Sequence, residues 1–355
     1  MIADAQGLAD LIDRLAPLSQ IALDTEADSL HSYFEKLCLI QISTESENCL
    51  FDPLAGLPLQ PLYDVLAGKR LILHGADYDL RLLNRGGNFA ATDVFDTMIA
   101  ARLSGYQELG LAALVARHFG VNLSKASQKA NWALRPLSNQ MLEYAMSDTK
   151  YLLSLAAILE AELRRLERWD WFIESRDRLI AAAREPRERD ETQAWRITGS
   201  AALGPRAQSI LRVLWYWRDG EAKAWDRPPF HVMNNEEMVR IAEKADRGEP
   251  YSTLRMSSRR RKSFEVVMAL AQHIPEREWP VTTKTRRHRA TREQTERFDS
   301  LKKTRDVAAV ELGLDPSIIA PRNALEAASL DPATPVLMRW QRRLLGLAEN
   351  TSAAA

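Results

Sequence analysis

The stretch IALDTE at residues 21–26 joins an apolar run to two acids. The apolar residues predict a buried strand, and Asp24 and Glu26 lie at its end. Residues two apart on a strand project to the same face, so the two carboxylates can share a cation. Charged residues also follow buried strands at ordinary turns, so this pair by itself is more typical of a solvated strand end.

Further strands surround this stretch in the first half of the chain. Apolar runs that alternate with turns predict them at KLCLIQIS (36–43), CLFDPL (49–54) and LILHG (71–75). Ser138 can cap a long helix whose apolar residues recur at three- and four-residue steps from Met141 past Leu152. We expect this helix to pack on the sheet, which makes the first half an α/β domain.

Two charged runs divide the rest of the chain. The run AREPRERDET (183–192) contains Pro186 and lacks apolar periodicity, so it predicts a linker. Beyond it the amphipathic segments predict helices, and a second charged run, TTKTRRHRATREQ (282–294), separates a last helical group. A chain of 355 residues exceeds the size of one core. The sequence therefore predicts an α/β domain followed by two small all-α domains.

The composition is that of a folded protein in a reducing compartment. Apolar residues make up 46% and charged residues 27%, which argues against long disorder. The 48 basic and 48 acidic residues balance, so net charge indicates no polyanionic partner. Cys38 and Cys49 lie in strand-like contexts, which disfavours a disulfide scaffold. The N-terminus is unlike a secretion signal and no apolar stretch could span a bilayer, so we expect a cytoplasmic protein without membrane attachment.

Two further groups of polar residues follow predicted elements. In LILHGADYDLRLL (71–83), Asp77 and Asp79 lie where a strand meets a helix, a place where carboxylates commonly stabilise the helix start. In MLEYAMSDTKYLL (141–153), Tyr144 and Asp148 lie four residues apart, on one face of a helix. Neither group is informative alone. A chain that carries all three groups in this order, on a strand, after a later strand and on a later helix, would rarely arise by chance.

This conjunction of acids suits phosphoryl transfer by two metal ions. Mg²⁺ and Mn²⁺ prefer oxygen ligands, and two such ions need several carboxylates without His or Cys. One ion would lower the pKa of an attacking water, and the other would stabilise the departing 3′ oxygen. A phenol has an ordinary pKa near 10, so we expect Tyr144 to orient the water by a hydrogen bond and leave its deprotonation to the metal.

With these motifs assembled, the chain resembles the ribonuclease D family, DEDD 3′-to-5′ exonucleases with a tyrosine in the third motif. LDTEADSLHSYFEKLCLIQIS (23–43) resembles the first motif, LILHGADYDLRLL the second, and NWALRPLSNQMLEYAMSDTKYL (131–152) the third. The resemblance selects Asp79 rather than Asp77 as the matched acid. It implies that Asp24, Glu26, Asp79 and Asp148 hold two divalent cations, Mg²⁺ or Mn²⁺, with Tyr144 as a further catalytic residue.

The resemblance covers nearly the whole chain. Residues 194–242 are similar to the HRDC domain of RecQ-type helicases and ribonuclease D, and residues 301–328 to its second copy. The resemblance implies a ribonuclease H-like exonuclease domain at 1–185, with a mixed sheet flanked by helices. It also implies an HRDC-type domain at 192–278 and a second HRDC-like domain at 290–355. The implied activity releases 5′-mononucleotides from RNA 3′ ends, with tRNA precursors as the usual substrate. The segment ADSLHSYFEKL (27–37) is more similar to the eukaryotic exosome-associated relatives than to some bacterial members of the family. This difference leaves the choice of substrate open.

Other residues have simpler interpretations. We expect His74 to be structural, Asp96 to cap a helix, and Trp215 and Trp217 to belong to a helical core. Two basic runs in the helical half are expected either to be solvated or to hold RNA: Arg259, Arg260, Arg261 and Lys262, and Lys284, Arg286, Arg287, Arg289 and Arg292. The chain is expected to act as a monomer. A DNA exonuclease of the same mechanism and an inactive nucleic-acid-binding scaffold are the alternatives.

Overall fold

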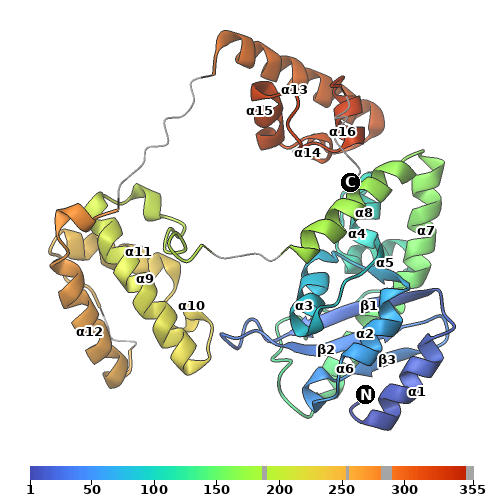
Figure 1. Cartoon of the computed structure of the whole chain (residues 1–355), viewed down its shortest axis with the longest axis horizontal. Coiled ribbons are helices and arrows are strands. Elements are labelled where there is room, and N and C mark those ends of the chain that lie inside the picture. Colours follow the sequence, from blue (N-terminus) through green and yellow to red (C-terminus); the bar gives the residue numbers. More distant parts are fainter. Residues whose placement is uncertain (186–189, 253–255, 281–289, 349–355) are drawn as a thin grey trace. The chain divides into compact units, whose positions relative to one another are not determined.

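The computed structural model describes residues 1–185, 190–252, 256–280 and 290–348, and its first part is a five-stranded sheet flanked by helices (Figure 1). The strands lie in the order β3-β2-β1-β4-β5. Their bounds are β1 Gln20–Ala27, β2 Leu37–Ser43, β3 Asn48–Phe51, β4 Arg70–Leu73 and β5 Asp93–Asp96. The first three pair antiparallel, whereas β4 is parallel to both β1 and β5. The predicted mixed sheet is therefore confirmed.

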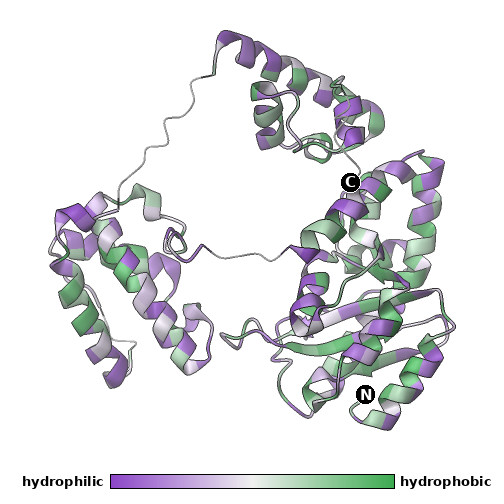
Figure 2. Ribbon diagram, in the orientation of Figure 1, coloured by the Kyte–Doolittle hydropathy of each residue, from purple (hydrophilic) through white to green (hydrophobic). Residues whose placement is uncertain are grey.

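Helices cover both faces of the sheet, which is why Ile21, Ala22 and Leu23 are all fully buried. Ile21 and Leu23 share a core with helices α1 (Ala5–Leu15), α2 (Gln60–Ala67) and α3 (Asp77–Gly87). Ala22 faces the other core, with α4 (Thr97–Leu103), α5 (Leu111–Phe119) and α7 (Leu152–Arg165). Helix α8 (Trp169–Arg184) contributes to both cores. Figure 2 shows hydrophobic strands between helices that carry hydrophilic outer faces.

The long helix predicted from Ser138 past Leu152 is wrong as a single element. Ser138 does cap a helix, because its side chain accepts a hydrogen bond from the backbone N–H of Met141, but that helix, α6 (Asn139–Lys150), ends before Tyr151. Helix α7 then begins at Leu152. The buried positions keep three- and four-residue steps across the break, at residues 145, 149, 152, 156, 159 and 163, so periodicity could not reveal it. As predicted, α6 packs on the sheet, against β1, β2 and β3.

Sequence reasoning missed the edge strand β5. It has four residues and pairs with β4, with Leu71 opposite Val94 and Leu73 opposite Asp96. So short a strand offers too few alternating positions to be recognised. Cys38 on β2 and Cys49 on β3 are free thiols, in agreement with the expected absence of a disulfide scaffold.

A second compact unit contains residues 28–36 together with the described residues of 187–287. Its helices are α9 (Pro205–Trp225), α10 (Pro229–Val232), α11 (Asn235–Asp246) and α12 (Ser258–Gln272). Trp215 and Trp217 belong to its core with Trp195, which confirms their predicted structural role. The described residues beyond 190 form helices without strands, so the all-α prediction for this half holds where the structure describes it.

The last helical group packs against helices of the sheet-containing part of the chain rather than standing alone. It comprises α13 (Arg292–Leu312), α14 (Pro316–Ile319), α15 (Arg322–Leu330) and α16 (Arg339–Leu344), and it shares a hydrophobic core with α4, α7 and α8. The rings of Trp171 and Trp340 stack with centroids 4.7 Å apart. Glu174 accepts hydrogen bonds from the backbone N–H groups of Arg339 (2.7 Å) and Trp340 (3.3 Å).

Among the helices in the described parts of the chain, none is both long enough and apolar enough to cross a membrane.

Candidate active site

Strand β1 presents Asp24 and Glu26 on the sheet face that α6 covers. Asp24 lies directly opposite Gln41 of β2, and Glu26 lies opposite Leu39. Opposed residues in an antiparallel pair point to the same face, and Leu39 packs in the small core that holds Ala145 of α6. The register shifts between Glu26 and the next residue, so the strand pairing becomes irregular just beyond the two acids.

Helix α6 supplies the other two predicted residues of this group. Tyr144 and Asp148 lie one turn apart, and the phenol donates a hydrogen bond to the Asp148 carboxylate. The Tyr144 ring lies 6.0 Å from the ring of the fully buried Trp132, which fixes its orientation. One carboxylate oxygen each from Asp24, Glu26 and Asp148 lie within 4.8 Å of one another. The structure therefore brings together three of the four predicted metal ligands.

The fourth predicted ligand, Asp79, reaches the same strand from α3. Its Oδ1 accepts hydrogen bonds from the backbone N–H (3.1 Å) and the hydroxyl (2.5 Å) of Thr25, the residue between Asp24 and Glu26. Asp79 is buried, whereas Asp77 forms an ion pair with Arg81 at 3.0 Å. Neither acid caps α3, because its N-cap residue, Ala76, has no side-chain capping bond. Asp79 stands beside the three-carboxylate group but is not one of its members.

Burial and mutual repulsion make these carboxylates hard to ionise. Burial and, after it, the nearby charge of Asp148 raise the pKa of Asp24 to about 7. Burial raises the pKa of Asp148 to about 7, although the Tyr144 hydrogen bond opposes the rise. For Glu26, burial and the charges of the other three acids raise the pKa to about 10. Burial and then the charge of Asp24 raise the pKa of Asp79 well above its ordinary value.

This donor set fits a divalent cation. It offers several carboxylate oxygens without nitrogen or sulfur, the ligands that hard cations prefer. Positive charge would relieve the repulsion that, after burial, raises the pKa values of Asp24, Glu26 and Asp79. The phenol of Tyr144 is suited to donating a hydrogen bond, because burial and the neighbouring acids raise its pKa far above the ordinary value.

We expect the stability of the metal-free chain to fall with rising pH. A carboxyl group whose pKa is raised by folding contributes stability that is fully present below its unfolded value near 4 and is lost as the pH passes its folded value. The window runs from about pH 4 through the folded values of about 7 for Asp24 and Asp148 and about 10 for Glu26. The melting temperature in chelator should therefore be lower at pH 9 than at pH 6.

Added Mn²⁺ should raise the melting temperature more at pH 9 than at pH 6, because protons compete with the metal at the lower pH. Asp24→Asn is the matched control, since it should lose most of this increment at both pH values. An equal increment at the two pH values in the unmodified chain would mean that the metal does not bind these carboxylates.

His74 and Asp96 take structural positions, as expected. His74 Nδ1 lies 2.9 Å from the hydroxyl of Thr97, and burial lowers the pKa of its imidazole. Asp96 is the N-cap of α4, where it accepts the backbone N–H groups of Met98 (2.8 Å) and Ile99 (3.2 Å). The predicted helix cap is therefore confirmed.

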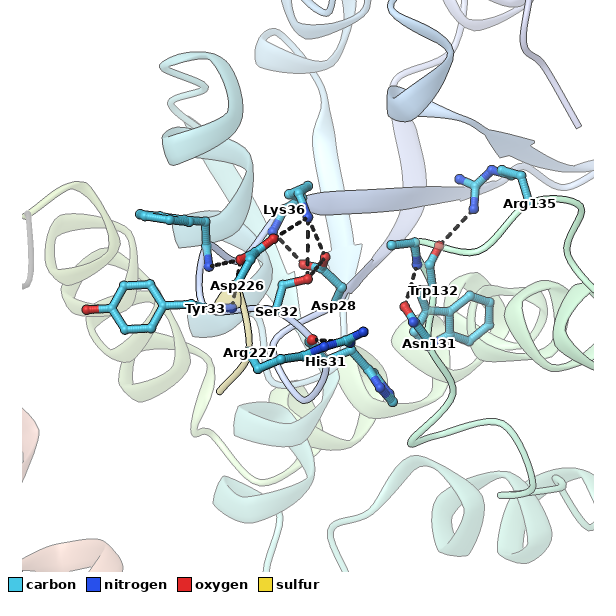
Figure 3. Close-up of polar contacts among 12 residues, drawn as sticks. Asp28, His31, Ser32, Tyr33, Lys36, Asn131, Trp132, Arg135, Asp226 and Arg227 are labelled. Atoms are coloured by element: carbon cyan, nitrogen blue, oxygen red, sulfur yellow. Dashed lines mark hydrogen bonds and ion pairs between the residues drawn. The ribbon is translucent and has the colours of Figure 1, made fainter. Parts of the chain in front are cut away.

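The segment that follows the first motif, residues 28–36, is closed by its own side chains (Figure 3). The fully buried Asp28 accepts hydrogen bonds from the backbone N–H of Lys36 (2.7 Å) and from the hydroxyl of Ser32 (2.6 Å). Lys36 Nζ also contacts Asp28 at 2.9 Å. The segment is thus an ordered turn between β1 and β2.

Residues at the end of α9 hold this segment from outside. The carboxylate of Asp226 accepts the backbone N–H of Tyr33 at 3.0 Å (Figure 3). Tyr33 Oη donates to Asp219 at 2.8 Å. Arg227 donates to the carbonyl of His31 at 2.9 Å. Sequence reasoning noticed this segment as a departure from bacterial patterns, but it had no signal for these partners, which lie nearly 200 positions away in the chain.

Arg135 anchors the loop that precedes α6. Its guanidinium forms a bidentate pair with Asp52, at 2.7 and 2.6 Å, and donates to the carbonyl of Cys38 at 2.8 Å. It also donates to the carbonyl of Trp132 at 2.8 Å (Figure 3). These contacts tie the loop before α6 to strand β2. Sequence reasoning missed Arg135, because a lone arginine before a proline carries no spacing signal.

The first basic run is only partly exposed to solvent. Arg260 stacks on Trp225 at 4.7 Å and has a side chain 15% exposed, so part of the run is structural. Arg259 has a side chain 78% exposed and pairs with Glu221 at 3.3 Å. In the second run, residues 284–289 lie outside the described residues, and Arg292 begins α13. Whether either run contacts RNA stays a prediction.

Two family models and several curated relatives match parts of this chain. Residues 1–164 match the model of a 3′-5′ exonuclease family, and residues 207–249 match that of the HRDC domain. Ribonuclease D of Sphingobium indicum is 31% identical over 285 residues, which cover 78% of this chain and 73% of the relative. Ribonuclease D of Bartonella henselae is 26% identical over 340 residues, which cover 92% of this chain and 83% of that relative.

The fold of a solved structure is also similar. The crystal structure of RNase D from Escherichia coli, an exoribonuclease involved in structured RNA processing, superposes with a TM-score of 0.69 at 24% identity. The match covers 99% of this chain and 92% of the other. Together, the exonuclease family and the carboxylate group indicate divalent cations as cofactors.

Proposed function

Because the chain belongs to the ribonuclease D family and is an exoribonuclease acting from the 3′ end, we propose that Asp24, Glu26, Asp79 and Asp148 together hold two divalent cations at its active site. The observation that carries this proposal is the approach of three carboxylate oxygens to within 4.8 Å of one another. Asp79 is held beside them by Thr25. Mg²⁺ and Mn²⁺ are the cations that such an oxygen-only set favours.

The reaction is hydrolysis of the terminal phosphodiester, which releases 5′-mononucleotides. When bound, the cations would favour deprotonation of the attacking water and stabilise negative charge on the departing oxygen. Tyr144 orients the water, because its phenol retains its proton and lies one helical turn from Asp148. Trp132 and Arg135 keep α6 and the loop before it in place.

RNA with a free 3′ end is the substrate, as the names of the ribonuclease D relatives suggest, and tRNA precursors are the class that we propose. We assign the exonuclease domain to residues 1–185, the HRDC-type domain to 192–278 and a second HRDC-like domain to 290–355. The enzyme acts in the cytoplasm as a monomer, and its two free cysteines are compatible with a reducing compartment.

An assay with end-labelled oligonucleotides tests this function. RNA labelled at its 5′ end should shorten one nucleotide at a time with Mg²⁺ and stay intact with chelator. DNA of matched sequence and RNA blocked at the 3′ terminus are the controls, and both should be cut far more slowly. Equal cleavage of RNA and DNA would favour the DNA exonuclease alternative, and internal cleavage would contradict an exonuclease.

A further inference from the structure

A buried amide without a partner lies next to the acidic group. Gln41 of β2 is fully buried, with 0% of its surface exposed. Among the described residues, neither its carboxamide oxygen nor its carboxamide nitrogen has a hydrogen-bond partner. A buried polar group without a partner costs folding free energy, so the position of Gln41 calls for a functional explanation.

The strand pairing places Gln41 beside Asp24. The two residues are directly opposite in the antiparallel pair of β1 and β2, so their side chains share one face and their Cβ atoms lie about 5 Å apart. On the other side, Gln41 is opposite Leu50 of β3. The polar neighbour of Gln41 across the strands is therefore Asp24.

Helix α6 packs over the face of β2 that carries Gln41. On the same face of β2, Leu39 packs in one core with Ala145, and Ser43 Oγ lies 2.6 Å from Thr149 Oγ1. Gln41 lies between these two contacts along the strand, because residues two apart project to the same side. The carboxamide is thus enclosed between Asp24 and the part of α6 that carries Asp148.

We propose that Gln41 is a positioning residue for the metal site, donating from Nε2 to the Asp24 carboxylate when that group holds a cation. A carboxylate has more acceptor positions than one cation uses, and a neutral amide can occupy one of them without adding charge. Hydrogen bonds of this kind orient metal ligands, and their loss typically weakens metal binding 10- to 100-fold. This inference rests on the proposed function.

Calorimetric titration of Mn²⁺ into the full-length, metal-stripped chain tests the proposal. Gln41→Met keeps the side-chain volume but removes the amide, and we expect its Mn²⁺ affinity to fall about 10- to 100-fold. Its melting temperature in chelator should be unchanged or higher, because the variant no longer buries an unpaired polar group. Gln41→Leu serves as a second variant, with the same expectation, if Gln41→Met does not fold.

Ser43→Ala is the matched control on the same strand face. It removes the contact with Thr149, so it should lower the melting temperature and leave the Mn²⁺ affinity unchanged. Unchanged Mn²⁺ affinity in a folded Gln41 variant would overturn the positioning role while leaving the proposed function intact. Failure of the unmodified chain to bind Mn²⁺ would instead overturn the proposed function, and this inference with it.

Discussion

Replacing Asp24 or Asp148 by Asn lowers the rate of RNA hydrolysis about a thousandfold, because each change removes a charge that holds a cation. The estimate follows from losing about 4 kcal/mol of transition-state stabilisation. Burial raises the pKa of both carboxyl groups to about 7, and the charge of Asp148 adds to the rise at Asp24, so a neutral amide also removes an unfavourable buried charge. The melting temperature in chelator should therefore be maintained or rise, and it should be measured beside the rate.

Asp77→Asn is the matched control for these variants. Asp77 precedes Asp79 by two residues and pairs with Arg81, and it is not one of the three carboxylates that lie within 4.8 Å of one another. This control should retain most of the activity. Asp79→Asn, in contrast, should lose as much activity as Asp24→Asn. More than a tenth of normal activity in folded Asp24→Asn would count against the site, and a larger loss from Asp77→Asn than from Asp79→Asn would show that the wrong acid was chosen.

Replacing Tyr144 by Phe lowers kcat about a hundredfold and hardly changes KM. The variant removes one oriented hydrogen-bond donor from a buried site, and losses of this kind typically cost 100- to 1000-fold in turnover. It keeps the ring that packs near Trp132, so α6 should stay in place. Single-turnover and steady-state kinetics on one RNA separate the two constants. A large rise in KM with normal kcat would place Tyr144 in substrate binding instead.

The sequence predicted that Asp24, Glu26 and Asp148 lie together, as they do in the structure, because spacing within a strand or helix restricts the geometry strongly. Asp24 and Glu26 had to share a strand face, and Tyr144 and Asp148 a helix face, whatever the rest of the fold. Asp79 was chosen over Asp77 by family resemblance alone. The structure supplies a physical reason, since Asp79 bonds Thr25 between the two strand acids while Asp77 pairs with Arg81.

Contacts between distant parts of the chain could not be read from local patterns. The hydrogen bonds from residues 28–36 to Asp226 and Asp219 link positions with no shared periodicity. The packing of the last helical group on α8 depends on Trp171 and Trp340, each of which resembles an ordinary helix residue in sequence. The position of Gln41 opposite Asp24 could not be predicted either. In KLCLIQIS it is a single polar residue among apolar neighbours, and the sequence does not show which residue lies across from it.

The central claim, that these four acids form a two-cation site, is tested most directly by diffraction from crystals of the full chain soaked in Mn²⁺. Anomalous scattering identifies manganese without relying on catalytic activity. We predict two manganese peaks among the carboxylates of Asp24, Glu26, Asp79 and Asp148, and the loss of at least one peak in Asp24→Asn. Crystals of the unmodified chain with no manganese among these four carboxylates would contradict the account.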